Sequence, residues 1–338
     1  MEKGKSNPQP TMTFAVTSCF YEGIFLVKQV LIIGDPLTTL KPATDTSLAL
    51  AEIALKKNYE VFWCEPQDIV FWNQSIHVVR PTVMPHTHIH ESFNRTEGLK
   101  PLADFSLIFV RKDPPFDTNY HDLCWILASQ NKVPVINRAE ALLRFHEKSL
   151  PWHAATWGIL DPQSNLVPTC LSEEWDVVES FCKTHSGPFV CKPWLGHAGS
   201  GVQLCHNVAE VKEAFFNRKE KLLVQPCLEE IHTQGDRRVF LINGKIAFHF
   251  VRFPPSDSVI SNTARGGRAE LCPLEGPLKT LCENLAQFLW SQGIFMAGLD
   301  IIGNRIGEIN ITSPTGIKIY EQLTGQNHCD TLLGALIP

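Results

Sequence analysis

The chain has 338 residues, of which 44% are hydrophobic, and a formal net charge of −5 at pH 7. This length allows two domains or one domain with a large insertion, and the hydrophobic content excludes disorder over most of the chain. The acidic balance excludes a basic surface over the whole molecule, so nucleic acid is not an expected partner.

Residues 1–28 form an extension to which the sequence assigns no role. Its apolar run from Phe14 to Val27 is interrupted by Glu22 and is too short to span a bilayer, so we expect neither a membrane segment nor a secretory signal. The eleven cysteines include no Cys-x-x-Cys pair. Their odd number favours reduced thiols in the cytoplasm.

Between residues 29 and 145, apolar runs alternate with helical periodicity. The expected strands cover residues 29–33, 60–64, 106–110 and 134–137, and the expected helices cover residues 46–57 and 120–129. Strands that alternate with helices are typical of an open α/β sheet. We therefore predict an N-terminal open-sheet α/β domain over residues 29–145.

A histidine-rich stretch interrupts this region between residues 76 and 95. Its histidines are His77, His86, His88 and His90. Alternating histidines would share one face of a strand. No acidic residue or thiol stands at a suggestive spacing, so we expect solvated loop histidines rather than a metal site.

The next region should contain strands at residues 188–193, 202–205 and 221–225, with a helix at residues 208–216. Lys192 stands at the end of the first strand and is followed by Gly196, Gly199 and Gly201. A lysine and closely approaching backbone amides can bind phosphate oxygens. The segment is not a Walker A loop because the lysine precedes the glycines. An ordinary glycine-rich turn remains the alternative.

Two strands at residues 238–242 and 245–251 should form a hairpin around Asn243-Gly244, before a polar loop and a helix at residues 277–292. Arginines that stand near these strand ends are Arg238, Arg252 and Arg268. Clustered arginines would clamp phosphates or carboxylates. The alternative is a solvated basic rim.

Residues 298–315 should form a hairpin that gathers oxygen ligands on one face. If residues 303–305 form a three-residue loop, Ile302 pairs with Ile306 and Asp300 lies opposite Glu308. Asn310 follows on the same face, because residues two apart in a strand share a face. These oxygens suit Mg²⁺, although a merely solvated polar face is the alternative. The residues that should point into the core are Ile301, Ile309 and Ile311.

Acidic oxygens for a metal, a lysine beside a glycine-rich turn and several arginines together describe a phosphoryl-transfer site. Such a site requires no activated serine, thiol or histidine. The chain also resembles the prokaryotic-type glutathione synthetases of the ATP-grasp superfamily over residues 30–333. The segments that carry this resemblance are Arg111–Thr118 (RKDPPFDT), Glu147-Lys148, Lys192-Pro193, Gly235–Arg238, Ala264–Arg268 and Gly298–Thr315.

The resemblance implies that an ATP-grasp domain covers residues 146–333, with a smaller lid subdomain at about residues 155–224. It implies a ligase that joins γ-glutamylcysteine to glycine through an acyl phosphate, forming glutathione, ADP and phosphate. ATP and Mg²⁺ would be required, with Mn²⁺ as a substitute. The protein would act as a homo-oligomer on small molecules, and the loop from residue 254 to residue 268 would keep water from the acyl phosphate.

The resemblance also implies roles for individual residues. Nucleotide contacts fall to Lys148, Lys192, Gly196, Gly199, Gln225, Leu228 and Asp236. Stabilisation of developing charge falls to Arg238, Arg252 and Arg268. Contacts to the amino-acid substrates fall to Ser47, Arg111, Asn262, Thr312, Ser313 and Thr315. Magnesium ligands are Asp300, Glu308 and Asn310.

Some positions depart from the family pattern. Leu195, His197 and Ala198 stand where an aspartate and a denser glycine run are usual, Ile260 replaces a common arginine, and Arg265 replaces a small residue. The predicted lysines and metal ligands are kept, so we expect activity with altered kinetics or an altered acceptor. The alternatives are a related ATP-grasp carboxylate-amine ligase with another acceptor, and a nucleotide-binding protein without turnover.

Overall fold

The computed structural model of the chain describes residues 28–85, 94–196, 199–255, 258–259, 261 and 266–338. The predictions that lie outside these residues concern residues 1–27 and the positions His86, His88, His90, His197, Ala198, Ile260, Asn262 and Arg265. Within the described part of the chain, no helix is both long and apolar enough to cross a membrane.

The N-terminal region is built on a six-stranded sheet with the order β6-β5-β2-β1-β8-β9. Its strands are β1 (Gln29–Gly34), β2 (Glu60–Cys64), β5 (Thr82–Val83), β6 (Asn94–Arg95), β8 (Leu107–Arg111) and β9 (Val135–Ile136). β1 runs parallel to β2 and β8, and β8 runs parallel to β9. The predicted open α/β sheet is confirmed, and the nearly continuous apolar sequence of β1 fits a strand that is buried on both faces.

Capping residues decide where the helices of this region begin. Asp45 accepts hydrogen bonds from the backbone N–H groups of Ser47 and Leu48 at the start of α1 (Thr46–Lys56). Asp117 accepts one from Tyr120 and starts α2 (Thr118–Ala128) two residues earlier than predicted. The helices thus begin at capping aspartates, which the pattern of apolar residues along the sequence does not mark.

A small antiparallel sheet of β3 (Ile69–Trp72), β4 (Ser75–Val79) and β7 (Leu99–Pro101) is a feature that sequence reasoning did not predict. Asn73 and Gln74 both have positive φ and make the turn between β3 and β4, as a type I′ hairpin requires. His77 lies on β4 and is buried. The prediction of a solvated loop histidine is therefore wrong for His77.

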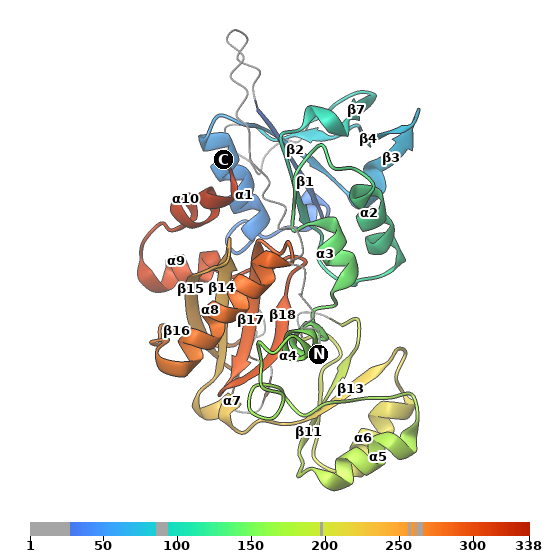
Figure 1. The fold of residues 1–338 in the computed structure, drawn as a ribbon, viewed down its shortest axis with the longest axis vertical. Helices are drawn as coiled ribbons and strands as arrows, with labels where there is room; N and C mark the ends of the chain where they lie inside the picture. The colour runs from blue at the N-terminus through green and yellow to red at the C-terminus, as the bar shows by residue number, and fades with distance from the viewer. Residues whose placement is uncertain (1–27, 86–93, 197–198, 256–257, 260, 262–265) are drawn as a thin grey trace, which may run out of the picture.

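The lid is a four-stranded antiparallel sheet with the order β10-β13-β11-β12, covered by two helices (Figure 1). Its elements are β10 (Cys170–Leu171), α5 (Trp175–Thr184), β11 (Phe189–Pro193), β12 (Gln203–Cys205), α6 (Val208–Phe216) and β13 (Leu222–Pro226). Its buried cluster, which includes Val178, Val211 and Val224, contains lid residues only. The bounds predicted for the domains and the lid stay predictions.

The C-terminal region contains a five-stranded antiparallel sheet, called the base below, with the order β16-β15-β14-β17-β18. Its strands are β14 (Asp236–Ile242), β15 (Lys245–Phe253), β16 (Arg268–Glu270), β17 (Met296–Ile302) and β18 (Arg305–Asn310). The turn at Asn243-Gly244 is confirmed because Ile242 pairs with Lys245. The remaining α-helices are α3 (Ala139–Arg144), α4 (Leu150–Thr156), α7 (Glu230–Thr233), α8 (Gly276–Ser291), α9 (Ile317–Thr324) and α10 (Cys329–Leu332).

The base shares its core with the N-terminal sheet. One buried cluster joins Ile33 and Val110 of the N-terminal sheet to Leu299 and Ile309 of the base, and a second joins strand residues of both sheets again. The lid, with its separate core, is therefore the part whose position can change with the smallest loss of buried apolar contacts.

The hairpin of β17 and β18 reaches the predicted pairing by another route. Ile302 pairs with Arg305, so only Gly303 and Asn304 form the loop, and the predictions of a three-residue loop and an Ile302–Ile306 pair are wrong. A bulge between Asp300 and Ile301 restores the register and places Asp300 opposite Glu308, as predicted. The residues predicted to be buried in the core, all at 1% exposure or less, are Ile301, Ile309 and Ile311.

Candidate active site

A cavity of about 220 Å³ that opens to solvent lies between the lid and the base. The predicted site residues that line it are Lys148, Lys192, Gly196, Gly199, Gln225, Leu228, Asp236, Arg238, Arg252, Asp300, Glu308 and Asn310. They come from β11, β13 and the segments that follow these two strands in the lid, from β14, β15, β17 and β18 of the base, and from the segment before α4. The fold thus gathers on one cavity residues that are up to 162 positions apart, from Lys148 to Asn310.

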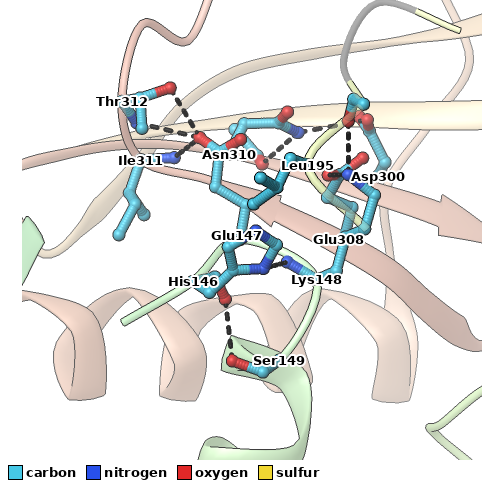
Figure 2. A network of polar contacts seen from close by, with 12 residues as sticks. His146, Glu147, Lys148, Ser149, Leu195, Asp300, Glu308, Asn310, Ile311 and Thr312 are labelled. Atoms are coloured by element: carbon cyan, nitrogen blue, oxygen red, sulfur yellow. Dashed lines mark hydrogen bonds and ion pairs between the residues drawn. The ribbon is translucent and has the colours of Figure 1, made fainter. Parts of the chain in front are cut away.

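Two lysines carry positive charge into this cavity. Lys192 is near the end of β11, and burial lowers its pKa while Glu308 opposes that shift. Lys148 Nζ lies 3.4 Å from Glu308 Oε1 and donates a hydrogen bond to the carbonyl oxygen of Gly196 (Figure 2). Lys192 of the lid and Lys148 of the segment before α4 therefore lie near the glycine-rich turn, where an anionic ligand would contact both.

The base side of the cavity holds two arginines on one aspartate. Arg238 contacts both carboxylate oxygens of Asp300, with distances of 2.7 Å and 3.2 Å, and Arg252 Nη2 lies 2.8 Å from Asp300 Oδ1. The sheet register produces this cluster, because Arg238 pairs with Asp300 across β14 and β17. Burial would raise the pKa of Asp300, but Arg238 and Arg252 outweigh burial and hold it below its ordinary value.

Asp236 is buried beside this cluster. Its Oδ2 accepts hydrogen bonds from Arg252 Nη2 at 2.5 Å and Ser261 Oγ at 2.6 Å. Its Oδ1 and Arg252 Nε have no hydrogen-bond partner among the residues that the structure describes. Burial raises the pKa of Asp236 although Arg252 opposes that shift. Buried polar atoms of native proteins are usually bonded, so these two atoms are candidates for contacts with a ligand.

Asp300, Glu308 and Asn310 supply oxygen donors on one face of the base hairpin. Asn310 donates through Nδ2 to the carbonyl oxygen of Gly298 and to Asp300 Oδ2, each at 3.1 Å, and neither bond uses its amide oxygen. Two carboxylates and a carboxamide fit a hard divalent cation that also takes phosphate oxygens. The third donor here is an amide, so this set is not a group of three His, Cys, Asp or Glu. No such group suited to a metal occurs among the described residues.

Two predicted substrate residues lie beneath the surface of the interface between the N-terminal sheet and the base. Arg111 is 3% exposed and donates to Ser47 Oγ and to the carbonyl oxygen of Pro314, at 3.0 Å each. Ser47 is also 3% exposed. Neither lines the described cavity, so the structure assigns them contacts inside the protein, and direct contact with a substrate stays a prediction.

The other predicted substrate residues follow β18. Thr312 is buried and bonded to Glu147, and Ser313 forms a hydrogen bond that lowers the pKa of Asp113, although burial of that carboxyl raises it overall. Thr315 lines a second cavity, and its carbonyl oxygen accepts a bond from Arg238 Nη1 at 2.8 Å.

Arg268 is not brought to the main cavity. It begins β16, its side chain is 68% exposed, and it pairs with Glu270. Its predicted role in charge stabilisation stays a prediction.

The second cavity lies between the N-terminal sheet and the base. Its charged lining residues are Asp35, Lys41, Asp45 and Asp113. Asp35 accepts the backbone N–H of Asp113 at 2.8 Å. Sequence reasoning missed both residues, although each follows the carboxyl end of a central parallel strand, where open α/β sheets bind ligands.

Apolar side chains complete the wall of the main cavity: Val167, Val190, Leu228, Ile231 and Ile302. Only Leu228 was predicted. Nothing in the sequence distinguishes the others from ordinary core residues, since the hydrophobic pattern gives burial but not what the residue is buried against. A flat apolar ligand such as a purine ring fits this part of the cavity.

Comparison with known proteins agrees with this arrangement. Residues 29–143 match the model of the prokaryotic glutathione synthetase N-terminal domain, and residues 160–325 match that of the prokaryotic glutathione synthetase ATP-grasp domain. A curated glutathione synthetase of Prochlorococcus marinus is 32% identical over 91% of this chain and 98% of the relative. One of Pseudomonas aeruginosa is 27% identical over 90% of this chain and 96% of the relative.

Solved structures share the fold. The D-cycloserine synthetase DcsG superposes with a TM-score of 0.63 at 14% identity, covering 91% of this chain and 98% of that one. The ATP-grasp ligase PsnB, in a complex with minimal precursor, Mg and ADP, gives a TM-score of 0.58 at 13% identity, covering 91% of this chain and 97% of that one. At such identities the likeness concerns the fold alone, and the fold is that of an ATP-grasp ligase.

Proposed function

The chain belongs to the prokaryotic glutathione synthetase family, and from that membership we propose that it is a ligase that joins γ-glutamylcysteine to glycine at the expense of ATP. The observation that carries the proposal is the single cavity on which two lysines, two arginines and three metal-type oxygen donors converge. That set is suited to phosphoryl transfer from a nucleotide.

We propose that ATP lies with its base against the apolar wall and its phosphates toward Lys148 and Lys192. Gly196 and Gly199 belong to the turn that would bring backbone amides to the phosphates. Asp236 would meet the ribose, which gives its unpartnered Oδ1 a hydroxyl donor. Gln225 and Leu228, at the end of β13 and just beyond it, would border the base.

Asp300, Glu308 and Asn310 would hold Mg²⁺, with Mn²⁺ as a substitute. The bound ion would supply charge neutralisation for the β- and γ-phosphate oxygens. Arg238 and Arg252 would share that task at the γ-phosphate. Because both guanidiniums are already anchored on Asp300, little reorganisation is needed when negative charge develops.

The second cavity is the place that we propose for the γ-glutamyl end of the dipeptide. Thr315 lines it and accepts a hydrogen bond from Arg238, so a dipeptide that lies there can direct its cysteinyl carboxylate toward the reaction centre. Asp113 and Asp35 would accept hydrogen bonds from the ammonium group of the glutamyl end, and Lys41 would form an ion pair with its carboxylate. Arg111 and Ser47 would support this cavity from beneath.

The reaction then runs in two balanced steps. The cysteinyl carboxylate attacks the γ-phosphorus, a carboxylate O–P bond forms, the bond to ADP breaks, and an acyl phosphate results. The glycine ammonium group first releases a proton to solvent, and the free amine attacks the acyl carbon. Phosphate leaves with its electron pair and takes up the proton that the new amide nitrogen loses. Arg238 and Arg252 would stabilise the oxyanion of the tetrahedral intermediate. The loop of residues 254–268, part of which lies outside the described residues, would exclude water that would otherwise hydrolyse the acyl phosphate.

We further propose that the protein works in the cytoplasm as a symmetric homo-oligomer. The ten described cysteines are all free thiols, which supports a reducing compartment. Size-exclusion chromatography with light scattering tests the oligomeric state.

A phosphate-release assay with ATP, Mg²⁺, γ-glutamylcysteine and a panel of amine acceptors tests the proposed activity. Phosphate should appear only when both amino-acid substrates are present, and glycine should be the preferred acceptor. No phosphate above the single-substrate controls would overturn the assignment. Glu308→Gln should abolish turnover; if wild-type protein binds ATP but forms no product with any acceptor, a binding protein without turnover is the correct description.

A further inference from the structure

Three consecutive residues of the segment before α4, His146, Glu147 and Lys148, each contact a different part of the site. The His146 ring stacks on the Trp194 ring of the lid, with 4.1 Å between centroids. Lys148 reaches Glu308 on β18 and Gly196 in the glycine-rich turn. Glu147, between them, has no role in the reaction described above.

Glu147 instead holds the chain that follows the metal-binding strand (Figure 2). Its Oε1 accepts three hydrogen bonds: from the N–H of Ile311 at 2.7 Å, from the N–H of Thr312 at 2.9 Å and from Thr312 Oγ1 at 2.9 Å. Its backbone oxygen accepts the N–H of Ile309 at 3.2 Å. One residue therefore fixes the backbone on both sides of Asn310.

The opposite side of the same segment is fixed from the N-terminal sheet. Asn137 is 3% exposed and donates from Nδ2 to the carbonyl oxygens of Ile311 and Met296, at 2.7 Å each. Its Oδ1 accepts the N–H groups of Phe295 and Met296, at 2.7 Å and 2.8 Å. The segment after Asn310 is thus bonded to Asn137, just beyond β9, through the carbonyl oxygen of Ile311, and to Glu147 through the N–H groups of Ile311 and Thr312.

A carboxylate suits this position better than a neutral acceptor, because three donors converge on one oxygen. Burial and the nearby Glu308 raise the pKa of Glu147, whereas the bonds from Thr312 and Ile311 lower it. Losing the contact would free Asn310 and Thr312 to shift relative to Lys148. A displacement of about 1 Å in a positioning group can cost about 100-fold in rate.

We propose that Glu147 is a positioning residue for the ligation step: it keeps the segment from Asn310 to Thr312 in register with Lys148, so that the acyl phosphate forms beside the acceptor. The inference rests on the proposed function, since it assigns Glu147 a task in that reaction. Its consequence is specific. Without the contact, more of the acyl phosphate should be lost to water before the amine reaches it.

The test compares Glu147→Asp and Glu147→Gln with wild type by measuring phosphate and tripeptide in the same reaction. Asp keeps the charge but is one methylene shorter, and Gln keeps the length and an acceptor oxygen. We expect kcat to fall about 10- to 100-fold for Glu147→Asp and less for Glu147→Gln. The KM for ATP should change little, because the hydrogen bonds that Glu147 accepts come from Ile309, Ile311 and Thr312, and the residues proposed to meet the base and ribose are elsewhere on the main cavity. The phosphate-to-tripeptide ratio should rise above one.

Glu321→Asp is the matched control. Glu321 Oε1 accepts the backbone N–H groups of His328 and Cys329, at 2.8 Å and 2.9 Å, outside the main cavity. Its shortening should lower stability without raising the phosphate-to-tripeptide ratio, since a merely structural loss reduces the amount of active enzyme and leaves the ratio at one.

The outcomes separate the two proposals. Wild-type protein that forms no tripeptide overturns the proposed function and this inference with it. Wild-type protein that forms tripeptide, together with a Glu147→Asp variant whose ratio stays at one, overturns the inference alone.

Discussion

Gly235 stands directly before Asp236, and its replacement by alanine connects backbone geometry to the arginine cluster. The residue has a φ of +71°, and a Cβ there would contact Val251 and would lie 2.8 Å from the carbonyl oxygen of Arg252. Gly158 has a nearly identical φ of +74° but open space around the position of its Cβ. Gly158→Ala is therefore the control variant, whose loss of stability comes only from the left-handed backbone conformation.

The magnitudes differ for that reason. The left-handed conformation costs an alanine about 1–2 kcal/mol, which is the whole effect expected at Gly158. Overpacking against Val251 and the Arg252 backbone adds about 1–3 kcal/mol at Gly235. At about 2 °C per kcal/mol for a chain of this size, the melting temperature should fall by about 2–4 °C for Gly158→Ala and about 4–10 °C for Gly235→Ala.

Differential scanning fluorimetry and the phosphate-release assay together check this reasoning. Gly235→Ala should also lower kcat, because the backbone of Arg252 must move and its guanidinium lies 2.8 Å from Asp300. Gly158→Ala should keep kcat. Equal losses of melting temperature in the two variants, with kcat unchanged in both, would refute the argument that the close approach at Gly235 positions Arg252.

Three further changes test other parts of the site. Arg238→Lys keeps the charge but loses the paired contact with Asp300, so kcat for phosphate release should fall about 100- to 1000-fold; a loss below two-fold would contradict its role. Asp113→Asn should raise the KM for γ-glutamylcysteine about 10-fold or more and leave the KM for ATP unchanged. Glutarylcysteine lacks the amino group that Asp113 would bind, so its KM should be equal in wild type and variant. Burial, and to a smaller extent Lys148, lower the pKa of His146 from 6.5 to about 4. Because the unfolded chain takes up the proton at a higher pH than the folded protein, the melting temperature of wild type should fall as the pH falls from 6.5 to 4. His146→Phe keeps a ring against Trp194 but has no such proton to take up, so its melting temperature should fall less over that range.

The sequence predicted most of the sheet architecture because burial leaves a periodic apolar signal and some turns leave a local one. The parallel strands of the N-terminal sheet and the Asn243-Gly244 hairpin are such cases. The sheet around β4 was missed because its turn, Asn73-Gln74, carries no glycine, and two residues with positive φ are not foreseeable without one. The predicted loop of the β17–β18 hairpin was wrong for a related reason, since a bulge changes loop length without changing which residues face each other.

The site divides in the same way. Charged residues of the base strands, such as Arg238 on β14 and Asp300 on β17, could be singled out because their chemistry is visible in the sequence. Asp35 and Asp113 were missed although each follows a strand of the N-terminal sheet, because their contact with each other forms only when β1 and β8 lie side by side. Glu147 was visible in a family segment, yet its contacts with Ile311 and Thr312 span 164 and 165 positions. Long-range polar contacts of this kind leave no local pattern in the sequence from which they could be predicted.

Transfer of isotope from the peptide carboxylate tests the central claim most directly. γ-Glutamylcysteine labelled with ¹⁸O in its cysteinyl carboxylate is incubated with ATP, Mg²⁺, glycine and the protein, and the released phosphate is examined by mass spectrometry. An acyl phosphate requires that one carboxylate oxygen leaves with the phosphate in each turnover, so labelled phosphate should appear in step with the tripeptide. Tripeptide formed together with unlabelled phosphate would contradict the acyl-phosphate route and the roles proposed for Arg238 and Arg252.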